Sequence, residues 1–348
     1  MKKFISLLLM LYAFAGTAIA ETRQMVEIPV GEGRTLSGII FLPDRTDPAP
    51  AVIVLHTAYG SVEDFDEDYA RALAKEGFVS LAVNYIHPSF GRAVWSPGII
   101  SDLVVVVDYL RQRPEAKNMP VGTVGFSLGS RGLQLSARHP QVKAVVVYYG
   151  TYDVRKENPR RAGRLPPGVT LPISVAPQVN AAVLLLHGEA DNEVPVSSAR
   201  DMKAELDKTG KKSELVVYPG AYHRFDRGAP TGARSDVSRD GYIYQKNPEA
   251  TKDAFQRTLA WFRTYLVGAP APNEQLDKGS SSSRTEKVGA EPVGPTGRTP
   301  SQVISGSDRD GDGKLSKSEF RGSPTAFTKI DTNEDGFIDK QELIKAWQ

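Results

Sequence analysis

Apolar and polar positions between residues 26 and 266 follow two alternating patterns. Short apolar runs such as Ala51–His56 are typical of buried strands, whereas segments with apolar positions three or four residues apart, such as Ile99–Arg111, predict helices. The predicted strands are Val26–Val30, Leu36–Phe41, Ala51–His56, Val79–Val83, Val121–Phe126, Val142–Tyr148, Ala182–His187 and Ser213–Val217. The predicted helices are Asp66–Glu76, Ile99–Arg111, Gly129–Arg138, Ser197–Lys208 and Ala250–Leu266. This alternation predicts an α/β fold with a doubly wound, mostly parallel sheet that helices cover on both faces.

The first 20 residues, MKKFISLLLMLYAFAGTAIA, have the three parts of a secretory signal peptide. Two lysines precede an apolar run from Phe4 to Ala15, and Ala18-Ile19-Ala20 forms a cleavage site of small residues. The apolar run is shorter than the ~20 residues that span a bilayer. We therefore expect an exported protein, periplasmic or secreted, with no membrane span in the mature chain.

Residues 268–300 interrupt the alternating pattern. They are rich in Gly, Pro, Ser and charged residues and contain almost nothing to bury, so they predict a flexible linker. The chain is thus predicted to consist of a signal peptide (1–20), an α/β domain (21–267), the linker (268–300) and a small C-terminal module (301–348).

Composition narrows the classes of partner. Hydrophobic residues make up 40% of the 348 positions, which supports a sizeable core. Without the two signal-peptide lysines, 41 basic side chains face 41 acidic ones, and no basic cluster occurs, so a nucleic acid partner is not expected. The chain has no cysteine, which excludes disulfides and a thiol nucleophile.

A Gly-x-Ser-x-Gly sequence, Gly125-Phe126-Ser127-Leu128-Gly129, lies between a predicted strand and a predicted helix. Ligands of an open parallel sheet bind where the strands end at their carboxyl edge. Small neighbours permit a sharp turn there, which would leave the Ser127 hydroxyl projecting above the sheet as a nucleophile. The alternative is an ordinary Gly-Ser turn that caps the helix.

A serine nucleophile needs a base that takes its proton and an acid that orients the base. Asp191 lies four residues after the seventh predicted strand, and His223 lies six residues after the eighth. The order Ser127, Asp191, His223 is the order that this kind of site requires. Asp191 could instead be a loop acid or a helix cap, and Glu189 and Glu193 are alternative acids.

An oxyanion hole is the remaining requirement for acyl transfer. One donor should be the backbone N–H of Leu128, directly after the nucleophile. The second should come from the turn after Ala51–His56, where Ala58 is favoured and Tyr59 is the alternative; Tyr59 is also a candidate substrate contact. The irregular stretch between residues 151 and 180 is expected to line the pocket and decide specificity.

Residues 26–266 resemble the dienelactone hydrolase family of α/β-hydrolases. The resemblance is strongest in GFSLGSRG, HGEADNEVP and YPGAYHRFDR, and in the closing helix NPEATKDAFQRTLAWFRTYL. It implies a hydrolase of esters or lactones with a Ser127-Asp191-His223 triad and no cofactor for the hydrolytic chemistry. It also implies that Arg227 holds a carboxylate of the substrate; the alternative is a surface arginine paired with Asp226.

Two departures from the family pattern bear on the substrate. The best-known members carry a cysteine at the position of Ser127, and a glutamate that activates the thiol at the position of Thr57. A serine nucleophile needs no such activation. The departures therefore favour ester hydrolysis over dienelactone cleavage.

Two acidic loops, DRDGDGKLSKSE and DTNEDGFIDKQE, begin 23 positions apart and resemble EF-hands. Each has oxygen-bearing side chains at positions 1, 3 and 5, Gly at position 6 and Glu at position 12, which is the pattern that binds Ca²⁺. The alternative is an acidic tail that binds no metal. The predicted ligands are Asp308, Asp310, Asp312, the Lys314 carbonyl and Glu319 in the first loop, and Asp331, Asn333, Asp335, the Phe337 carbonyl and Glu342 in the second.

The two calcium sites are expected to be structural or to dock a protein partner rather than to take part in catalysis. Calcium is abundant and steady outside the cytoplasm, which disfavours a sensor role. The short spacing, with Gly322 and Pro324 between the loops, predicts abbreviated helices. This spacing resembles that of dockerin modules, although dockerins usually lack the Glu at position 12.

Together these features predict an exported serine hydrolase that cleaves a small ester or lactone, in some cases one bearing a carboxylate, through an acyl-enzyme. One alternative is acyl transfer or peptide hydrolysis on the same triad. Another is a calcium-dependent binding or scaffold protein with an inactive hydrolase domain. The presence of both Ser127 and His223 counts against that alternative.

Overall fold

The computed structural model describes residues 22–58, 61–86, 95–96, 98–157, 165, 168–230, 233–268, 300–305, 307, 314–320, 322–332 and 336–347. The predicted signal peptide, nearly all of the predicted linker and Tyr59 lie outside the described residues. Where the chain is described, none of its helices combines the length and the apolar character that a bilayer span requires.

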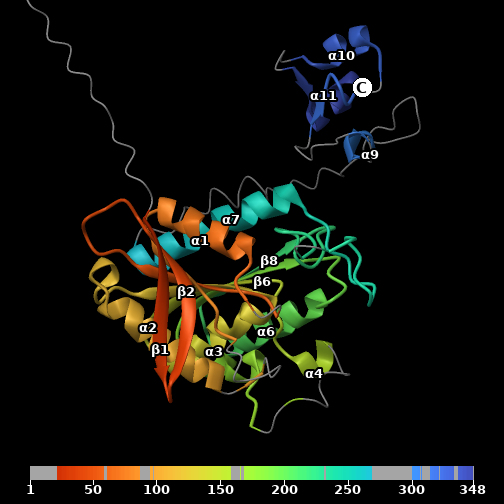
Figure 1. Cartoon of the computed structure of the whole chain (residues 1–348). Coiled ribbons are helices and arrows are strands. Elements are labelled where there is room, and N and C mark those ends of the chain that lie inside the picture. The colour runs from red at the N-terminus through yellow and green to blue at the C-terminus, as the bar shows by residue number, and fades with distance from the viewer. Residues whose placement is uncertain are drawn as a thin grey trace, which may run out of the picture.

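An eight-stranded sheet forms the centre of the main domain, in the order β1-β2-β4-β3-β5-β6-β7-β8 (Figure 1). The strands are β1 (Thr22–Gly31), β2 (Arg34–Leu42), β3 (Ala51–Leu55), β4 (Val79–Val83), β5 (Val121–Phe126), β6 (Val142–Tyr148), β7 (Ala182–Gly188) and β8 (Ser213–Tyr218). β3 to β8 pair in parallel, whereas the β1–β2 hairpin joins β4 in antiparallel orientation. The prediction of a mostly parallel α/β sheet is confirmed.

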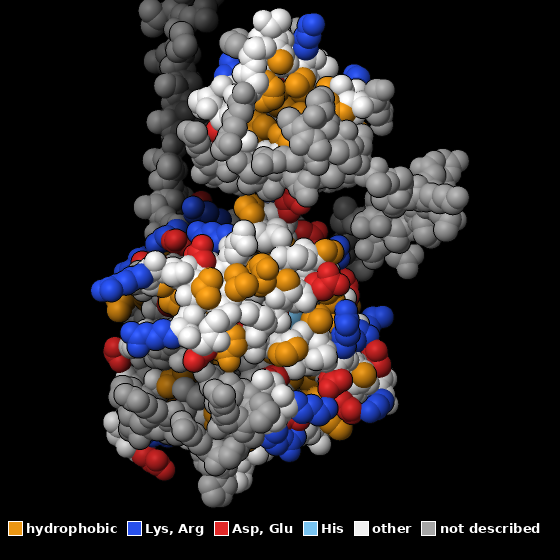
Figure 2. Space-filling model, turned by 90° about the vertical axis from the view of Figure 1, so that its right-hand side faces the viewer, with side chains coloured by type: hydrophobic (Ala, Val, Ile, Leu, Met, Phe, Trp, Pro, Cys, Tyr) orange, Lys and Arg blue, Asp and Glu red, His pale blue; other side chains and the backbone are white. Residues whose placement is uncertain are grey.

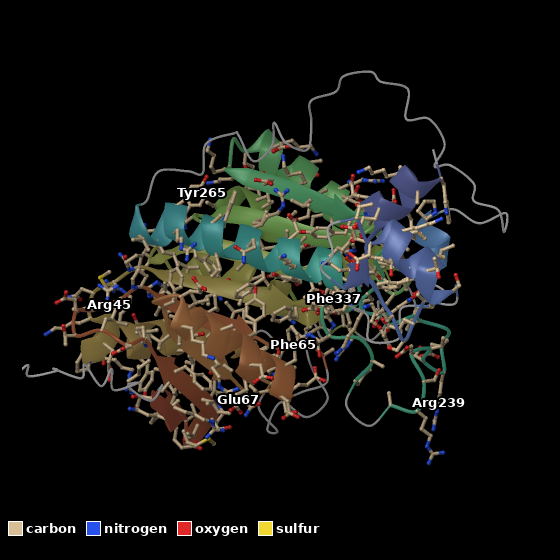
Figure 3. All side chains as sticks on the ribbon, turned by 90° about the horizontal axis from the view of Figure 1, so that it is seen from above. Arg45, Phe65, Glu67, Arg239, Tyr265 and Phe337 are labelled. Atoms are coloured by element: carbon tan, nitrogen blue, oxygen red, sulfur yellow. The ribbon has the colours of Figure 1, made fainter. Side chains whose placement is uncertain are left out.

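Helices cover both faces of the sheet, because strands with apolar residues on both sides must be buried on both sides. One face carries α1 (Asp64–Lys75) and α7 (Pro248–Phe262), which run side by side when seen from above (Figure 3) and meet through the rings of Tyr69 and Phe255 at 5.3 Å. The other face carries α2 (Gly98–Gln112), α3 (Arg131–Arg138) and α6 (Val196–Lys208). Two apolar clusters, one on each face, make up the core.

The stretch between residues 151 and 180 holds more regular structure than its sequence indicates. It contains the short helix α4 (Val154–Glu157) and a 3₁₀ helix, η4 (Pro172–Gln178), which packs against α3 and α6. Pro172 at the start of η4 and Pro177 inside it obscure the helical pattern in the sequence, because proline ordinarily marks a loop. The remaining short helices are η2 (Pro114–Ala116), η3 (Ser127–Ser130) and the π-helical turn η5 (Arg263–Val267), which extends α7.

The C-terminal module has its own small core. Its described elements are α9 (Pro300–Ser305), β9 (Leu315–Ser316), α10 (Pro324–Ile330), β10 (Phe337–Ile338) and α11 (Lys340–Ala346). β9 and β10 form an antiparallel pair in which Leu315 faces Ile338. The described helices are only six or seven residues long, as the short repeat spacing predicted.

Candidate active site

The chain makes a sharp turn between β5 and α3, and Ser127 lies at its start. Ser127 has a φ of +54°, a left-handed conformation that is unfavourable for a residue with a side chain. A Cβ atom on Gly125 would overlap the carbonyl oxygen of Gly129, and one on Gly129 would overlap that of Leu55. The two glycines are therefore required by close backbone contacts, as expected for a turn that presents a serine at the end of a strand.

The structure brings Ser127, His223 and Asp191 together from three different loops at the carboxyl edge of the sheet. The Ser127 hydroxyl lies 3.2 Å from His223 Nε2 and can donate to it. His223 Nδ1–H donates to Asp191 Oδ2 at 2.7 Å. Nδ1 must carry the proton because the carboxylate only accepts. Nε2 is then free to accept the serine proton, which is the arrangement that activates a serine.

Three further contacts hold the Asp191 carboxylate in place. Its Oδ1 accepts from the backbone N–H groups of Glu193 (3.0 Å) and Val194 (2.8 Å), and His187 Nε2 lies 3.3 Å from its Oδ2. Burial raises the pKa of Asp191, but charge and hydrogen bonds from His223 and His187 lower it more, and the net pKa is well below the ordinary value. Asp191, rather than Glu193, is therefore the carboxylate that His223 Nδ1 contacts, and its role as the acid of a triad stays a prediction.

Glu193 occupies the opposite side of the same imidazole. Its Oε2 lies 3.6 Å from His223 Nε2 and accepts from the Tyr244 hydroxyl at 2.8 Å. Burial lowers the pKa of His223, but Asp191 and Glu193 raise it, and the net shift is upward. Glu189, the other alternative acid, is exposed. The sequence suggested Glu193 only as a rival of Asp191, not as a second carboxylate on the ring.

The turn at Ser127 packs against the end of β3, because Gly129 lies directly against Leu55. Leu128 is buried in this turn, and Ala58 follows β3 by three residues. The backbone of Leu128 therefore lies near the turn that holds Ala58. The oxyanion role of these two residues stays a prediction.

Arg227 is buried in the domain and is not a surface arginine. Its side chain is 2% exposed, and Nη1 donates to Asp66 Oδ1 at 2.8 Å. The guanidinium packs against the rings of Phe65 and Phe126, which are perpendicular to each other, with its central carbon 3.9 Å from each ring centroid. Figure 3 labels Phe65 on α1. The main partner is Asp66 rather than Asp226, which lies 3.6 Å from Nε. The role of Arg227 as a substrate clamp stays a prediction.

Arg224 connects the loop after β8, which carries His223, to the start of α1. It follows His223 directly, has a φ of +58° and is buried. Its Nε donates to the Gly228 carbonyl at 2.7 Å, and its two terminal nitrogens lie 3.3 and 3.2 Å from the carboxylate oxygens of Glu63. These bonds hold in place the backbone from which the His223 side chain extends.

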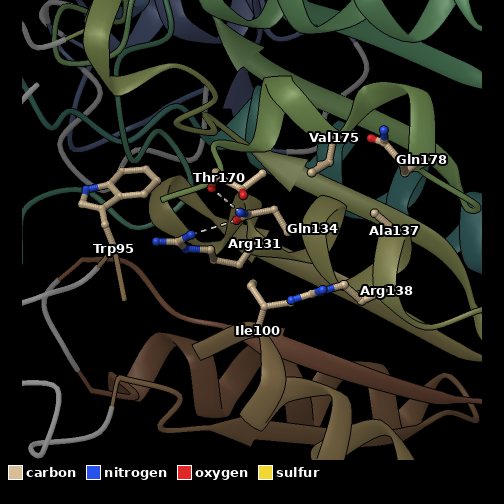
Figure 4. A pocket seen from close by; sticks show the side chains of 9 residues that line it. All are labelled: Trp95, Ile100, Arg131, Gln134, Ala137, Arg138, Thr170, Val175 and Gln178. Atoms are coloured by element: carbon tan, nitrogen blue, oxygen red, sulfur yellow. Dashed lines mark hydrogen bonds between the residues drawn. The ribbon is translucent and has the colours of Figure 1, made fainter. Parts of the chain in front are cut away.

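A cavity of about 200 Å³ lies beside α3, the helix that follows the nucleophile turn (Figure 4). Its walls include Trp95, Arg131, Gln134 and Thr170. The Arg131 guanidinium stacks on Trp95 at 4.3 Å and donates to Gln134 Oε1 at 2.8 Å, and Gln134 Nε2 donates to the Thr170 carbonyl. Part of the stretch between residues 151 and 180 thus lines this cavity, but Ser127 is not among its described lining residues, so the role of this stretch in specificity stays a prediction.

The carboxyl edge of the sheet lies on the right of Figure 1, the side that Figure 2 turns toward the viewer. On the described surface of this face, Lys and Arg side chains are interspersed with Asp and Glu, and a small area of histidine is visible (Figure 2). Such a mixed surface does not favour a polyanionic partner.

The C-terminal module orients several predicted calcium ligands. Glu342 accepts from the backbone N–H groups of Thr332 (2.8 Å) and Asp339 (3.1 Å), and Asp331 Oδ2 accepts from that of Gly336 (3.1 Å). Asp331 Oδ1 is buried with no hydrogen-bond partner among the described residues. An orphaned carboxylate oxygen suits a hard cation. Lys314, Glu319 and Phe337 are also described, whereas Asp308, Asp310, Asp312, Asn333 and Asp335 lie outside the described residues.

Comparisons with known proteins match two families in the chain. The model of the dienelactone hydrolase family matches residues 36–266, and the EF-hand model matches residues 308–322 and 325–346. A protein of Methylorubrum extorquens, provisionally named carboxymethylenebutenolidase, is 28% identical over 260 residues, which cover 70% of this chain and 81% of that protein. A protein of Escherichia coli K12 with the same provisional name is 29% identical over 241 residues, which cover 64% of this chain and 80% of that protein.

Solved structures share the fold. The crystal structure of a provisionally assigned dienelactone hydrolase from Klebsiella pneumoniae superposes with a TM-score of 0.58 at 26% identity. The superposition covers 71% of this chain and all of that one. The match to the dienelactone hydrolase family ends at residue 266, and the EF-hand match begins at residue 308.

Proposed function

Because this chain belongs to the dienelactone hydrolase family and carries a C-terminal EF-hand segment, we propose that it is a serine hydrolase that cleaves esters or lactones. The observation that supports this most directly is the chain of contacts from Ser127 through His223 to Asp191. The names of the relatives denote a lactonase, which supports the same class of substrate. No cofactor enters the proposed reaction.

The proposed reaction begins when Ser127 Oγ attacks the carbonyl carbon of the substrate and His223 Nε2 takes the serine proton. The negative charge that develops on the carbonyl oxygen is stabilised by the backbone N–H groups of Leu128 and Ala58. Nε2–H then protonates the leaving alcohol, which leaves an ester on Ser127. Water attacks this ester with His223 as the base. His223 then returns the proton to Ser127 Oγ, which releases the free acid and restores the serine hydroxyl.

Labelling with a fluorophosphonate probe tests the proposal, because such probes react with serines that a neighbouring base activates. We expect the label on Ser127, located by mass spectrometry of the modified peptide. His223→Ala should lose the label, whereas His139→Ala, which changes a histidine outside the triad, should keep it. Absence of label on folded protein would overturn the proposal and favour an inactive hydrolase domain in a binding or scaffold protein.

We further propose that the C-terminal module binds two Ca²⁺ ions and serves stability or docking rather than catalysis. Glu319 and Glu342 would supply bidentate carboxylates, and Ca²⁺ would satisfy the buried Asp331 Oδ1. Calorimetric titration of the full chain should give two Ca²⁺ per chain, and Glu319→Gln and Glu342→Gln should each remove one site. Ester hydrolysis should be equal in Ca²⁺ and in chelator. A loss of activity in chelator would contradict the separation of the two parts.

Export is proposed from residues 1–20. The mature chain is then expected to begin at Glu21, in the periplasm or the medium. Determination of the N-terminal peptide of the fractionated protein by mass spectrometry tests this, and a cell-associated chain that keeps residues 1–20 would contradict it.

A further inference from the structure

Both ring nitrogens of His223 face a carboxylate. Asp191 Oδ2 lies 2.7 Å from Nδ1, and Glu193 Oε2 lies 3.6 Å from Nε2. In a serine triad the Nδ1 carboxylate orients the ring, while Nε2 exchanges protons with the serine and with the leaving group. The Glu193 carboxylate therefore lies beside the reacting atoms, where the triad itself requires no second acid.

Glu193 is held in this position by a neighbouring loop. The Tyr244 hydroxyl donates to Glu193 Oε2 at 2.8 Å, and Tyr244 is 5% exposed. Asn192, the residue before Glu193, donates from its side-chain amide to the Gly241 carbonyl (2.9 Å) and accepts from the Ile243 N–H (3.0 Å). The loop around residues 241–244 thus holds the loop that carries Asp191 and Glu193, and it orients the Glu193 carboxylate toward the imidazole.

The Glu193 side chain is more accessible to solvent than the imidazole that it faces. Its side chain is 22% exposed, whereas that of His223 is 2% exposed. The two arginines that follow His223 in the same loop form ion pairs with other carboxylates, Arg224 with Glu63 and Arg227 with Asp66. Within the described residues, the ion pairs of Glu193 include no Lys or Arg, so its negative charge is directed at His223 and at whatever binds next to it.

We propose that Glu193 is a specificity residue that makes the leaving-group side of this site negative. The leaving alcohol must receive its proton from Nε2–H, so it binds at Nε2 and next to Glu193. Esters of amine-bearing alcohols are then favoured, neutral alcohols are accepted, and leaving groups that carry a carboxylate are disfavoured. The inference rests on the proposed serine-hydrolase function and adds the charge class of the alcohol to it.

Three acetate esters of similar shape test this inference. Their alcohols are choline, which is cationic, 3,3-dimethylbutanol, its neutral counterpart, and 3-hydroxypropanoate, which is anionic. kcat/KM is measured for each by titration of the released acid at low salt. A charge in direct contact with another at a partly exposed site changes binding by about tenfold. We therefore expect kcat/KM of the wild type to be higher for the cationic than for the anionic ester by at least about that factor.

Two glutamine variants separate the effect of Glu193 from a general loss of charge. Glu193→Gln removes the charge but keeps an oxygen that accepts from Tyr244, and it should bring the cationic-to-anionic ratio close to one. Glu189→Gln removes the same charge from an exposed position two residues before Asp191, and it should keep the wild-type ratio. The wild-type ratio should fall as salt is raised, which a purely steric role would not produce.

The outcomes separate this inference from the function on which it rests. A wild-type ratio near one, or an equal ratio in wild type and Glu193→Gln, overturns the role of Glu193 while ester hydrolysis stands. Tyr244→Phe provides a second variant, because it removes only the bond that positions Glu193; it should lower the ratio in part. If no ester is hydrolysed and Ser127 is not labelled by a fluorophosphonate, the hydrolase function falls, and the inference falls with it.

Discussion

Replacement of Arg227 by methionine tests whether the buried guanidinium is part of the fold or a contact for the substrate. Arg227 packs against the rings of Phe65 and Phe126 and donates to Asp66, which is fully buried. Methionine is close in volume and packs well against aromatic rings, so the change removes the charge and keeps most of the packing. Asp66 retains one hydrogen bond, from the backbone N–H of Glu63 at 2.9 Å.

The expected cost follows from the buried charge that is left behind. Removal of one partner of a buried ion pair typically costs about 3–5 kcal/mol, because the other charge stays buried without compensation. In a domain of this size, 1 kcal/mol corresponds to a change of about 2–4 °C in Tm. We therefore expect the Tm of Arg227→Met to lie roughly 10 °C below that of the wild type.

Thermal unfolding followed by circular dichroism at neutral pH measures this loss. The double variant Asp66→Asn/Arg227→Met has neither charge and should recover most of the lost stability. A clamp for the substrate carboxylate would give a different result, with a Tm close to that of the wild type and a raised KM confined to carboxylate-bearing esters. A Tm within about 2 °C of the wild type would refute the structural reasoning.

Three further substitutions test the proposed chemistry. Asp191→Asn allows the wrong tautomer of His223, so kcat for ester hydrolysis should fall by about 10⁴-fold while Tm changes little; a loss below tenfold would contradict the triad. Glu193→Gln removes one of the carboxylates that raise the pKa of His223, so the neutral base persists to lower pH and the acidic limb of the kcat/KM profile should move downward; an unmoved limb would contradict this. Gly129→Ala forces a methyl group against the Leu55 carbonyl, so fluorophosphonate labelling should be lost, and retained labelling would contradict the packing of the turn.

The sequence was sufficient for the main elements of the hydrolase domain because its buried strands and amphipathic helices have distinct periods. The positions of Ser127, Asp191 and His223 could be predicted for a related reason. Each follows a predicted strand, and the carboxyl ends of parallel strands meet at one edge of the sheet. The geometry agrees, because Ser127 lies within hydrogen-bonding distance of His223, and His223 within hydrogen-bonding distance of Asp191.

Contacts between distant segments could not be predicted in the same way. Arg227 pairs with Asp66 across 161 positions, and no local pattern links a residue after β8 to the first turn of α1. The side of His223 that Glu193 faces depends on the path of an irregular loop and on the bonds of Asn192 and Glu193 to residues 241–244. Two acids separated by one residue in a loop were a signal that both could reach one ring, but the sequence could not assign the nitrogens.

The pairing of β9 with β10 has a thermodynamic consequence for the C-terminal module. Leu315 and Ile338 occupy the eighth position of the two predicted calcium loops and face each other in the strand pair. An ion that orders one loop also orders the strand against which the other loop is built, so the second loop has less entropy left to lose. The proposed Ca²⁺ ions are therefore expected to bind with positive cooperativity and a Hill coefficient above one. The module would then pass from empty to full over a narrow range of free calcium.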